Sequence, residues 1–338
     1  MTFLMKALNR RHFLKSSIVA TASLPWLAGY GQEKQTANAS PATLKPIGAN
    51  GDIRYAVVGL NGRGKNHLDE MAPLSGARLV AICDVDSVVL KREQERLEKS
   101  GKKLAAYTDI RKLLENPDID VVTFATPNHW HALGAIWAIQ AGKDVYLEKP
   151  VSHNVWEGRQ VIGAARQHQR IVQAGTQSRS SQGIAEAIAW TREGHLGKLL
   201  RARGLCYKRR PSIGLTDQPL EIPSTIDFDL WCGPAPKEPI KRKKLHYDWH
   251  WVWPTGNGDL GNQGIHEMDV ARWVLGEPKL SPRVLSIGGR LGYQDNGTTP
   301  NTLIILHDYK PAPLLYEVRG LPSAEGSSKM DKIGRAHV

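Results

Sequence analysis

The 338-residue sequence has few cysteines, few phenylalanines and no long apolar run. Its three cysteines are too few to form a disulfide framework in a chain of this size. The apolar stretch 16–30 is short and contains Pro25, which excludes a permanent membrane-spanning helix of about 20 apolar residues. Glycine and proline, at 32 and 20 residues, follow no period, so fibrous repeats are also excluded. The length, with 41% hydrophobic and 23% charged residues, is typical of a globular chain with two domains.

A surplus of basic residues gives the chain a formal net charge of +12. Part of it lies in residues 9–15 (NRRHFLK), a twin-arginine motif that precedes the short apolar stretch. We expect residues 1–39 to be a twin-arginine leader read by the Tat export machinery, with a cleavage site at 37–39 and a linker over 40–51. This predicts a periplasmic or extracytoplasmic protein that is free of the membrane after processing and holds its cofactor tightly.

The remaining basic residues do not indicate a nucleic-acid partner. Five basic residues and one acidic residue give the leader a net charge of +4, which leaves +8 for the rest of the chain. The clusters 208–210 and 241–244 lie in segments with proline and glycine and are typical of a solvated surface. They could attract an acidic polysaccharide, but no nucleic-acid-binding motif accompanies them.

A strand, a glycine-rich turn, a helix and a second strand follow one another from residue 53. The first strand is 53–58, the turn is 59–64 (GLNGRG), and the second strand, 78–83, ends at Asp84. This order is typical of a dinucleotide-binding unit, whose glycines let the backbone approach a pyrophosphate at the helix N-terminus. Asp84 would bind the adenosine ribose and disfavour a 2′-phosphate, so NAD is expected, with NADP as the alternative. Asn61 stands where the strict fingerprint has glycine, and we expect it to tolerate a left-handed backbone.

Strands and helices continue to alternate as far as residue 176. Further strands are expected at 119–125, 144–147 and 171–173, and helices at 85–100, 128–141 and 154–168. This alternation predicts a doubly wound parallel sheet over 52–176. Ligands of such sheets bind beyond the carboxyl ends of the strands, so the loops that follow each strand are the expected binding loops.

Four segments resemble the glucose–fructose oxidoreductase/inositol dehydrogenase family (Gfo/Idh/MocA): 126–131 (TPNHWH), 148–150 (EKP), 228–236 (FDLWCGPAP) and 256–269 (GNGDLGNQGIHEMD). The resemblance extends from residue 53 to about 322. It implies an N-terminal Rossmann domain, a C-terminal α/β domain with a large open sheet, NAD(P)-dependent chemistry on sugars or cyclitols, and a homo-oligomer. With the turn and Asp84, the implied cofactor-binding residues are Gly59, Asn61, Gly62, Arg63, Gly64, Asp84, Thr126, Pro127, Asn128, His131, Glu148 and Lys149.

Three residues are the candidates for catalysis. Oxidation of a carbinol by hydride transfer needs a group that takes the hydroxyl proton, and Lys149, buried at a strand end, could have the lowered pKa that this requires. A helix that begins near Asn262 would place Asn262 and His266 on one face. In the family the residue four before this histidine is usually Asp. Because Asn cannot take a proton, Lys149 and His266 are the better acid/base candidates, and a simple copy of the family's dehydrogenase mechanism does not follow.

Residues 246–254 (HYDWHWVWP) are the densest aromatic stretch of a chain with ten Trp and four Phe. Flat aromatic faces suit sugar C–H faces, while His and Asp bind hydroxyls, which indicates a carbohydrate pocket. The alternative is a strand in which Trp249, Trp251 and Trp253 fill one buried face at period two. The expected substrate-binding residues are Asp248, Trp249, His250, Trp251 and His266.

Two other histidine-containing motifs are weaker. His129 and His131, and the acidic residues around His266, are metal-ligand types without the spacing of a zinc site, so no metal is expected.

Strands are expected at 303–307 and 314–318 of a second domain over 177–331. Residues 332–338 end the chain without a capping element, and 333–338 match one frame of a sequencing adapter. We therefore expect a non-native tail and an incomplete second sheet.

Together these features predict an α/β enzyme with a Rossmann domain and a second α/β domain. The expected function is an exported NAD(P)-dependent oxidoreductase that acts on CH–OH groups of a sugar, cyclitol or glycoside. One alternative is a glycoside-processing enzyme that oxidises, eliminates and reduces within one turnover, so that bound NAD is regenerated. The other is a sugar-binding or cofactor-binding protein without turnover.

Overall fold

The computed structural model describes residues 51–321 and 336–337. The predicted leader and nearly all of the predicted linker lie outside the described residues, as does most of the predicted tail. By their contacts, residues 47–338 form one unit of the chain.

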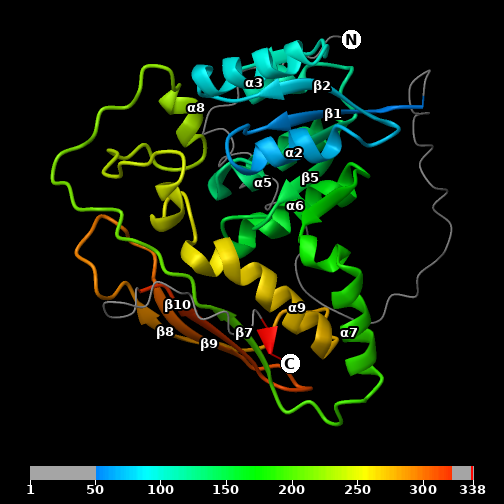
Figure 1. The fold of residues 1–338 in the computed structure, drawn as a ribbon, viewed down its shortest axis with the longest axis vertical. Coiled ribbons are helices and arrows are strands. Elements are labelled where there is room, and N and C mark those ends of the chain that lie inside the picture. The colour runs from blue at the N-terminus through cyan, green and yellow to red at the C-terminus, as the bar shows by residue number, and fades with distance from the viewer. Residues whose placement is uncertain (1–50, 322–335, 338) are drawn as a thin grey trace, which may run out of the picture. The chain divides into compact units, whose positions relative to one another are not determined.

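Six parallel strands of the described chain form the first sheet, in the order β3-β2-β1-β4-β5-β6 (Figure 1). The strands are β1 (Ile53–Val58), β2 (Ala77–Cys83), β3 (Ala105–Tyr107), β4 (Val121–Phe124), β5 (Asp144–Glu148) and β6 (Val172–Gly175). The order reverses between β1 and β4, so the loops after these two strands diverge and leave a crevice at the carboxyl edge of the sheet. Strand β3 was not predicted, because its three half-buried residues form an apolar run too short to mark a strand.

Three of the five connecting helices begin at a polar side-chain cap. The five helices are α2 (Arg63–Met71), α3 (Ser87–Lys99), α4 (Ile110–Leu114), α5 (Asn128–Gln140) and α6 (Val155–Gln167), and the capped ones are α3, α4 and α6. At α3 the Asp86 side chain accepts the Val88 N–H, and at α6 the Asn154 side chain accepts the Glu157 N–H, each at 3.0 Å. Helix α5 buries almost every residue, which holds its N-terminal residues against the sheet.

The second sheet is mixed and has the order β11-β7-β10-β9-β8. Its strands are β7 (Ala202–Cys206), β8 (Val284–Gly289), β9 (Thr302–His307), β10 (Leu314–Arg319) and β11 (Ala336–His337), and only the β7–β10 pair is parallel. Helix α9 (Ile265–Leu275) packs on one face of this sheet (Figure 1). Its Ala271 and Leu275 belong to the same buried core cluster as Leu314 and Tyr316 of β10. The predicted architecture of a Rossmann sheet followed by an α/β domain is confirmed.

The opposite face of the second sheet exposes apolar side chains. Ile287 of β8 lies directly across from Ile304 of β9, and Leu285 shares their face. Their exposed fractions are 74%, 51% and 68%. Scattered apolar residues are normal on a surface, whereas these three are neighbours on one face of the sheet.

The aromatic stretch 246–254 is not a strand. Residues Asp248–Trp251 form a 3-10 helix, η2, in which the His250 N–H donates to the Tyr247 carbonyl at 3.3 Å. Main-chain turns lie on either side of it, since the Asp248 N–H donates to the Lys244 carbonyl and the Gly256 N–H to the Val252 carbonyl. Trp251 is buried while Trp253 is 47% exposed, so the tryptophans do not share one buried face. The strand alternative is therefore wrong.

Candidate active site

A cavity of about 880 Å³ opens at the carboxyl edge of the parallel sheet. Its wall combines loops that follow β1, β2, β4 and β5 with residues of the C-terminal half. A volume of this size is typical of a small-molecule site. The predicted residues that line it are Gly59, Asn61, Gly62, Arg63, Asp84, Thr126, Pro127, Asn128, His131, Glu148, Lys149, Trp249, His250, Asn262 and His266. Gly64, Asp248 and Trp251 are predicted site residues that do not line it.

The glycine-rich turn is shaped by close backbone contacts. Gly59 has a φ of +80°, and a Cβ there would lie 2.9 Å from the Ala125 main chain. A Cβ on Gly64 would lie 1.7 Å from the Gly59 carbonyl oxygen, so Gly64 permits the contact between α2 and the turn. The left-handed positions are Gly59 and Gly62, whereas Asn61 does not adopt a positive φ. The turn thus fits a dinucleotide without needing the left-handed conformation expected of Asn61.

Asp84 holds the turn from the neighbouring strand. Its carboxylate accepts the Leu60 N–H at 2.8 Å and the Asp86 N–H at 3.0 Å. Burial raises the pKa of Asp84, and these two backbone donors oppose the rise. The carboxylate lines the cavity at the end of β2, where it can accept hydrogen bonds from a ribose.

Glu148 is the centre of a buried polar cluster beneath the turn. One carboxylate oxygen, Oε1, accepts Arg63 Nε at 2.8 Å, His67 Nε2 at 3.0 Å and Gln177 Nε2 at 3.2 Å. Burial alone would raise the pKa of Glu148, but the hydrogen bonds from His67 and Arg63 outweigh it and lower that pKa to about 2. The cluster joins α2, β5 and the segment after β6, and so fixes the turn relative to the strand end that carries Lys149.

Lys149 reaches from the end of β5 across to the C-terminal half. Its Nζ donates to the main-chain carbonyl of Asn262 at 2.6 Å and to Asn262 Oδ1 at 3.3 Å. Burial lowers the pKa of Lys149, Glu148 opposes this, and the nearby Lys208 adds to it. The amine is therefore easier to deprotonate than a surface lysine, which suits an acid/base group.

Asn262 belongs to a single π-helical turn, η3 (Leu260–Gly264), that leads directly into α9. Such turns occur often at functional sites, because they offset the residues that follow. Asn262 and His266 both line the cavity, so the expected grouping of these residues with Lys149 is present.

Two neutral imidazoles face the same cavity. Burial lowers the pKa of His250 and of His266 to about 4, with nearby Lys149 adding to both shifts. His250 Nδ1 lies 2.6 Å from the Tyr247 carbonyl oxygen, which can only accept, so Nδ1 carries the proton and Nε2 is left as an acceptor. The His250 ring stacks on Trp249 with centroids 3.6 Å apart.

Asn128 and His131 fix the loop after β4. Asn128 Nδ2 donates to Asn257 Oδ1 at 2.9 Å. The buried His131 ring lies between the carbonyl oxygens of Pro150, at 2.5 Å from Nδ1, and Thr126, at 2.8 Å from Nε2. The peptide between Lys149 and Pro150 is cis. His131 thus links the loop after β4 to the loop that carries Lys149.

Two predicted substrate-binding residues instead support the aromatic wall from behind. The buried Asp248 carboxylate accepts the Lys244 N–H at 3.2 Å, and burial raises its pKa. Trp251 is buried beneath the Arg210 guanidinium, whose carbon lies 5.2 Å from the ring centroid.

Several lining residues were missed by sequence reasoning: Trp130, Gln177, Leu230, Trp231, His246 and Tyr247. His246 Nε2 lies 2.9 Å from Asp86, and the Thr225 carbonyl accepts the Ser87 N–H at 2.9 Å. The stretch 225–250 therefore folds back over the loop after β2. The FDLWCGPAP segment and the aromatic stretch were the available signals, but neither indicates which residues face a ligand.

Residues 53–176 match the GFO_IDH_MocA family, described as an oxidoreductase family with an NAD-binding Rossmann fold, and residues 199–306 match its C-terminal alpha/beta domain. The two matches together cover more than half of the chain, which therefore belongs to this oxidoreductase family. The predicted NAD-binding domain is confirmed.

The similar proteins are named either as glycosidases or as dehydrogenases. An alpha-N-acetylgalactosaminidase of Shewanella oneidensis is 34% identical over 181 residues, and glycosyl hydrolase family 109 protein 2 of Shewanella sp. (strain ANA-3) is 31% identical over 176. Each match covers 49% of this chain and 39% of the relative, so the chain spans about two fifths of the length of the curated relatives it matches. The fold also matches the WlbA dehydrogenase of Bordetella pertussis, solved with NADH and UDP-GlcNAcA, with TM-score 0.63, 21% identity and coverage of 81% of this chain and 74% of that one.

The described part of the chain holds no group of three His, Cys, Asp or Glu side chains placed to bind a metal ion. None of its helices is long and apolar enough to cross a membrane. Cys83, Cys206 and Cys232 are buried, and none of them forms a disulfide within the described residues.

Proposed function

We propose that this protein oxidises a carbinol of a sugar, cyclitol or glycoside, with NAD held in the 880 Å³ cavity and Lys149 as the acid/base group. One observation carries the proposal. Lys149 Nζ, with a lowered pKa, is anchored 2.6 Å from the Asn262 carbonyl in the cavity that the cofactor-binding glycines also line.

The turn 59–64 and Asp84 would hold NAD, which would supply the acceptor for the hydride of the carbinol carbon. Lys149, when its amine is deprotonated, takes the hydroxyl proton as the carbon–oxygen double bond forms, and returns it in the reverse direction. The free Nε2 of His250 accepts a hydrogen bond from a second hydroxyl, and His266 offers a second neutral imidazole. Trp249 presents an indole to the apolar face of the ring.

The test begins with native mass spectrometry of the purified protein for a bound dinucleotide, followed by nicotinamide absorbance with a panel of sugars and cyclitols. We expect net NADH with at least one of them. Lys149→Ala should keep the dinucleotide and lose about 10²- to 10⁴-fold in turnover, the usual contribution of a general acid/base group. Lys65→Ala, which removes an exposed lysine of α2, is the control. Full activity of Lys149→Ala would refute the mechanism.

A second candidate is the redox-neutral glycoside cycle. It is supported by the glycosidase names of the curated relatives and by the two imidazoles, which can move the protons of elimination and addition. Its signature is product release from a glycoside without net NADH. A protein that binds dinucleotide and sugar but gives neither signal would be the non-catalytic alternative.

Two properties of the whole protein are proposed alongside. The exposed apolar face of β8 and β9 supports a homo-oligomer, which light scattering would detect. The twin-arginine motif supports export, and replacing Arg10 and Arg11 by lysine should keep the protein in the cytoplasmic fraction.

A further inference from the structure

We infer that Arg210 is a positioning residue that sets the spacing between two walls of the cavity. One wall carries His250, and the other carries Asn262, the anchor of Lys149. Arg210 itself does not line the cavity, so it acts through the residues that do. The inference rests on the proposed function in one respect: its effect on kcat requires that the cavity is a reaction site.

On one side, Arg210 holds the start of the π-helical turn. Its Nε and Nη2 donate to the two carboxylate oxygens of Asp259, at 2.9 and 2.7 Å. The Asp259 side chain is 2% exposed and immediately precedes η3. A bidentate pair fixes orientation as well as distance, so this contact sets where η3 begins and hence where Asn262 lies.

On the other side, Arg210 holds the aromatic wall. Its Nη1 lies 3.2 Å from the Tyr247 hydroxyl, and its guanidinium covers the buried Trp251 ring. The Tyr247 carbonyl is the group that fixes the His250 tautomer. A single planar group therefore contacts both ends of the segment that contains His250.

The main chain of Arg210 is itself held in place. Its N–H donates to the Gly320 carbonyl, and its carbonyl accepts the Tyr293 hydroxyl, each at 2.7 Å. Three residues further along, the Ile213 N–H donates to the Asp295 carboxylate at 3.0 Å.

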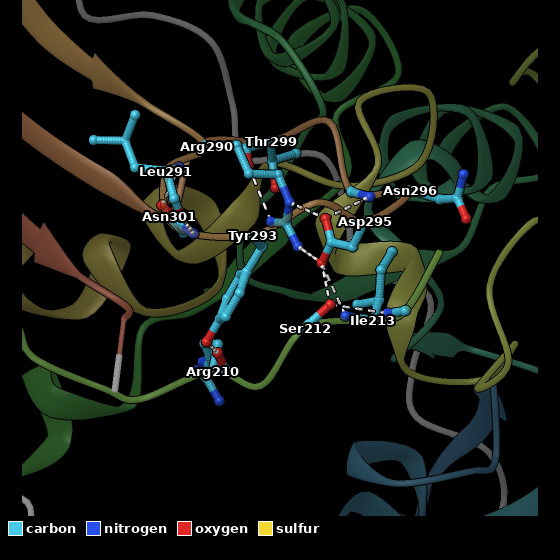
Figure 2. Close-up of polar contacts among 12 residues, drawn as sticks. Arg210, Ser212, Ile213, Arg290, Leu291, Tyr293, Asp295, Asn296, Thr299 and Asn301 are labelled. Carbon is cyan, nitrogen blue, oxygen red and sulfur yellow. Dashed lines mark hydrogen bonds and ion pairs between the residues drawn. The ribbon is translucent and has the colours of Figure 1, made fainter. Parts of the chain in front are cut away.

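Figure 2 shows Ser212 and Arg290 converging on the same carboxylate, which Arg290 contacts at 2.6 and 2.5 Å. The Asp295 side chain is fully buried. The segment that carries Arg210 is thus fastened to the β8–β9 connection, and the guanidinium projects from a fixed base. A lysine has one donor centre and cannot span Asp259 and Tyr247 together.

The decisive variant is Arg210→Met/Asp259→Asn, which removes both charges, because Arg210→Met alone would leave a buried carboxylate unpaired and could unfold the protein. Arg210→Lys is the second variant, since it keeps a charge opposite Asp259. The matched control is Arg203→Met/Glu317→Gln, an ion pair of the second sheet that touches no cavity residue.

Three measurements are made on each purified protein: dinucleotide content by native mass spectrometry, kcat and KM on the best substrate, and the His250 titration by NMR. A displacement of about 1 Å costs about 100-fold in rate. We therefore expect kcat to fall about 100-fold in the double variant, KM to change less, and the dinucleotide content to stay unchanged. Loss of Arg210 should also raise the pKa of His250 from about 4, since burial, Lys149 and Arg210 together lower it.

Arg210→Lys should not restore kcat. The inference is overturned if the double variant matches the control in both kcat and the His250 titration. If the wild-type protein turns over no substrate, the proposed function fails, and Arg210→Lys then tests the positioning by itself, because it keeps the positive charge near His250. A His250 titration that differs from the wild type in Arg210→Lys supports the positioning role, and an unchanged one overturns it.

Discussion

Replacing Glu148 by glutamine tests the buried cluster that supports the cofactor turn. The side chain is 5% exposed and accepts hydrogen bonds from Arg63, His67 and Gln177 through a single oxygen. Glutamine keeps the shape and one acceptor but removes the charge that the Arg63 guanidinium faces. The variant therefore isolates the electrostatic part of the cluster.

The size of the effect follows from the lowered pKa of Glu148. From the ordinary value of 4.5 to about 2, at about 1.36 kcal/mol per pKa unit, the ionised carboxylate contributes about 3 kcal/mol to the free energy of unfolding. Because the folded-state pKa lies below the unfolded one, this contribution is complete above pH 4.5. It declines as the pH falls from 4.5 and is lost below about 2.

Urea unfolding of the wild type and Glu148→Gln at pH 7, 5 and 3.5 measures the difference. We expect the variant to be less stable by about 3 kcal/mol at pH 7 and 5, with the gap narrowing by about 1.4 kcal/mol per pH unit below 4.5. Glu70→Gln is the control, because Glu70 is 64% exposed and 3.7 Å from Arg63, so it should change stability by no more than about 0.5 kcal/mol. A gap below about 1 kcal/mol at pH 7, or one independent of pH between 5 and 3.5, refutes the reasoning.

The remaining predictions use other contacts of the site. Gly64→Ala should lower the free energy of unfolding in urea by about 1–3 kcal/mol and lower the dinucleotide content, because its Cβ would lie 1.7 Å from a carbonyl oxygen. The control is Gly163→Ala, whose Cβ would have nothing within 4 Å and which should raise the free energy of unfolding by up to about 1 kcal/mol. Trp130→Phe should cost about 1 kcal/mol, because the Leu230 carbonyl of α8 (Phe228–Cys232) loses the indole donor 3.0 Å away, whereas the Trp231 carbonyl keeps His129 Nε2 at 3.0 Å. Because burial lowers the pKa of His250 and His266 to about 4, an NMR titration of these imidazoles should show midpoints near pH 4, and midpoints near 6.5 would contradict their burial.

The Rossmann half could be predicted from the sequence because its signals are local. Apolar runs of four to seven residues mark the buried strands, and the glycine-rich turn stands directly after the first of them. Strand ends then predicted the binding loops, which is why Asp84, Glu148 and Lys149 lie on one cavity. The three half-buried residues of β3 carry no such pattern.

The C-terminal contribution could not be predicted in the same way. The alternating tryptophans of 246–254 are typical of a strand, but main-chain hydrogen bonds to Lys244 and Val252 close this stretch into turns. The π-helical turn has no pattern of its own, since the same residues would suit an α-helix. The stretch 225–250 brings Trp231, His246 and Tyr247 to the cavity because it folds back onto Asp86 and Ser87. Ser87 and its partner Thr225 are more than 130 positions apart in the sequence.

The anchor of Lys149 is a main-chain oxygen, and every amino acid supplies one. The side chain at position 262 can therefore be exchanged in evolution or by design without taking away the oxygen at 2.6 Å that holds the amine. The position of the Lys149 amine therefore does not depend on whether the side chain at position 262 is ionisable. An exchange of a carboxylate for an amide at this position changes which groups of the pocket can bind a proton, while the position of the Lys149 amine stays the same.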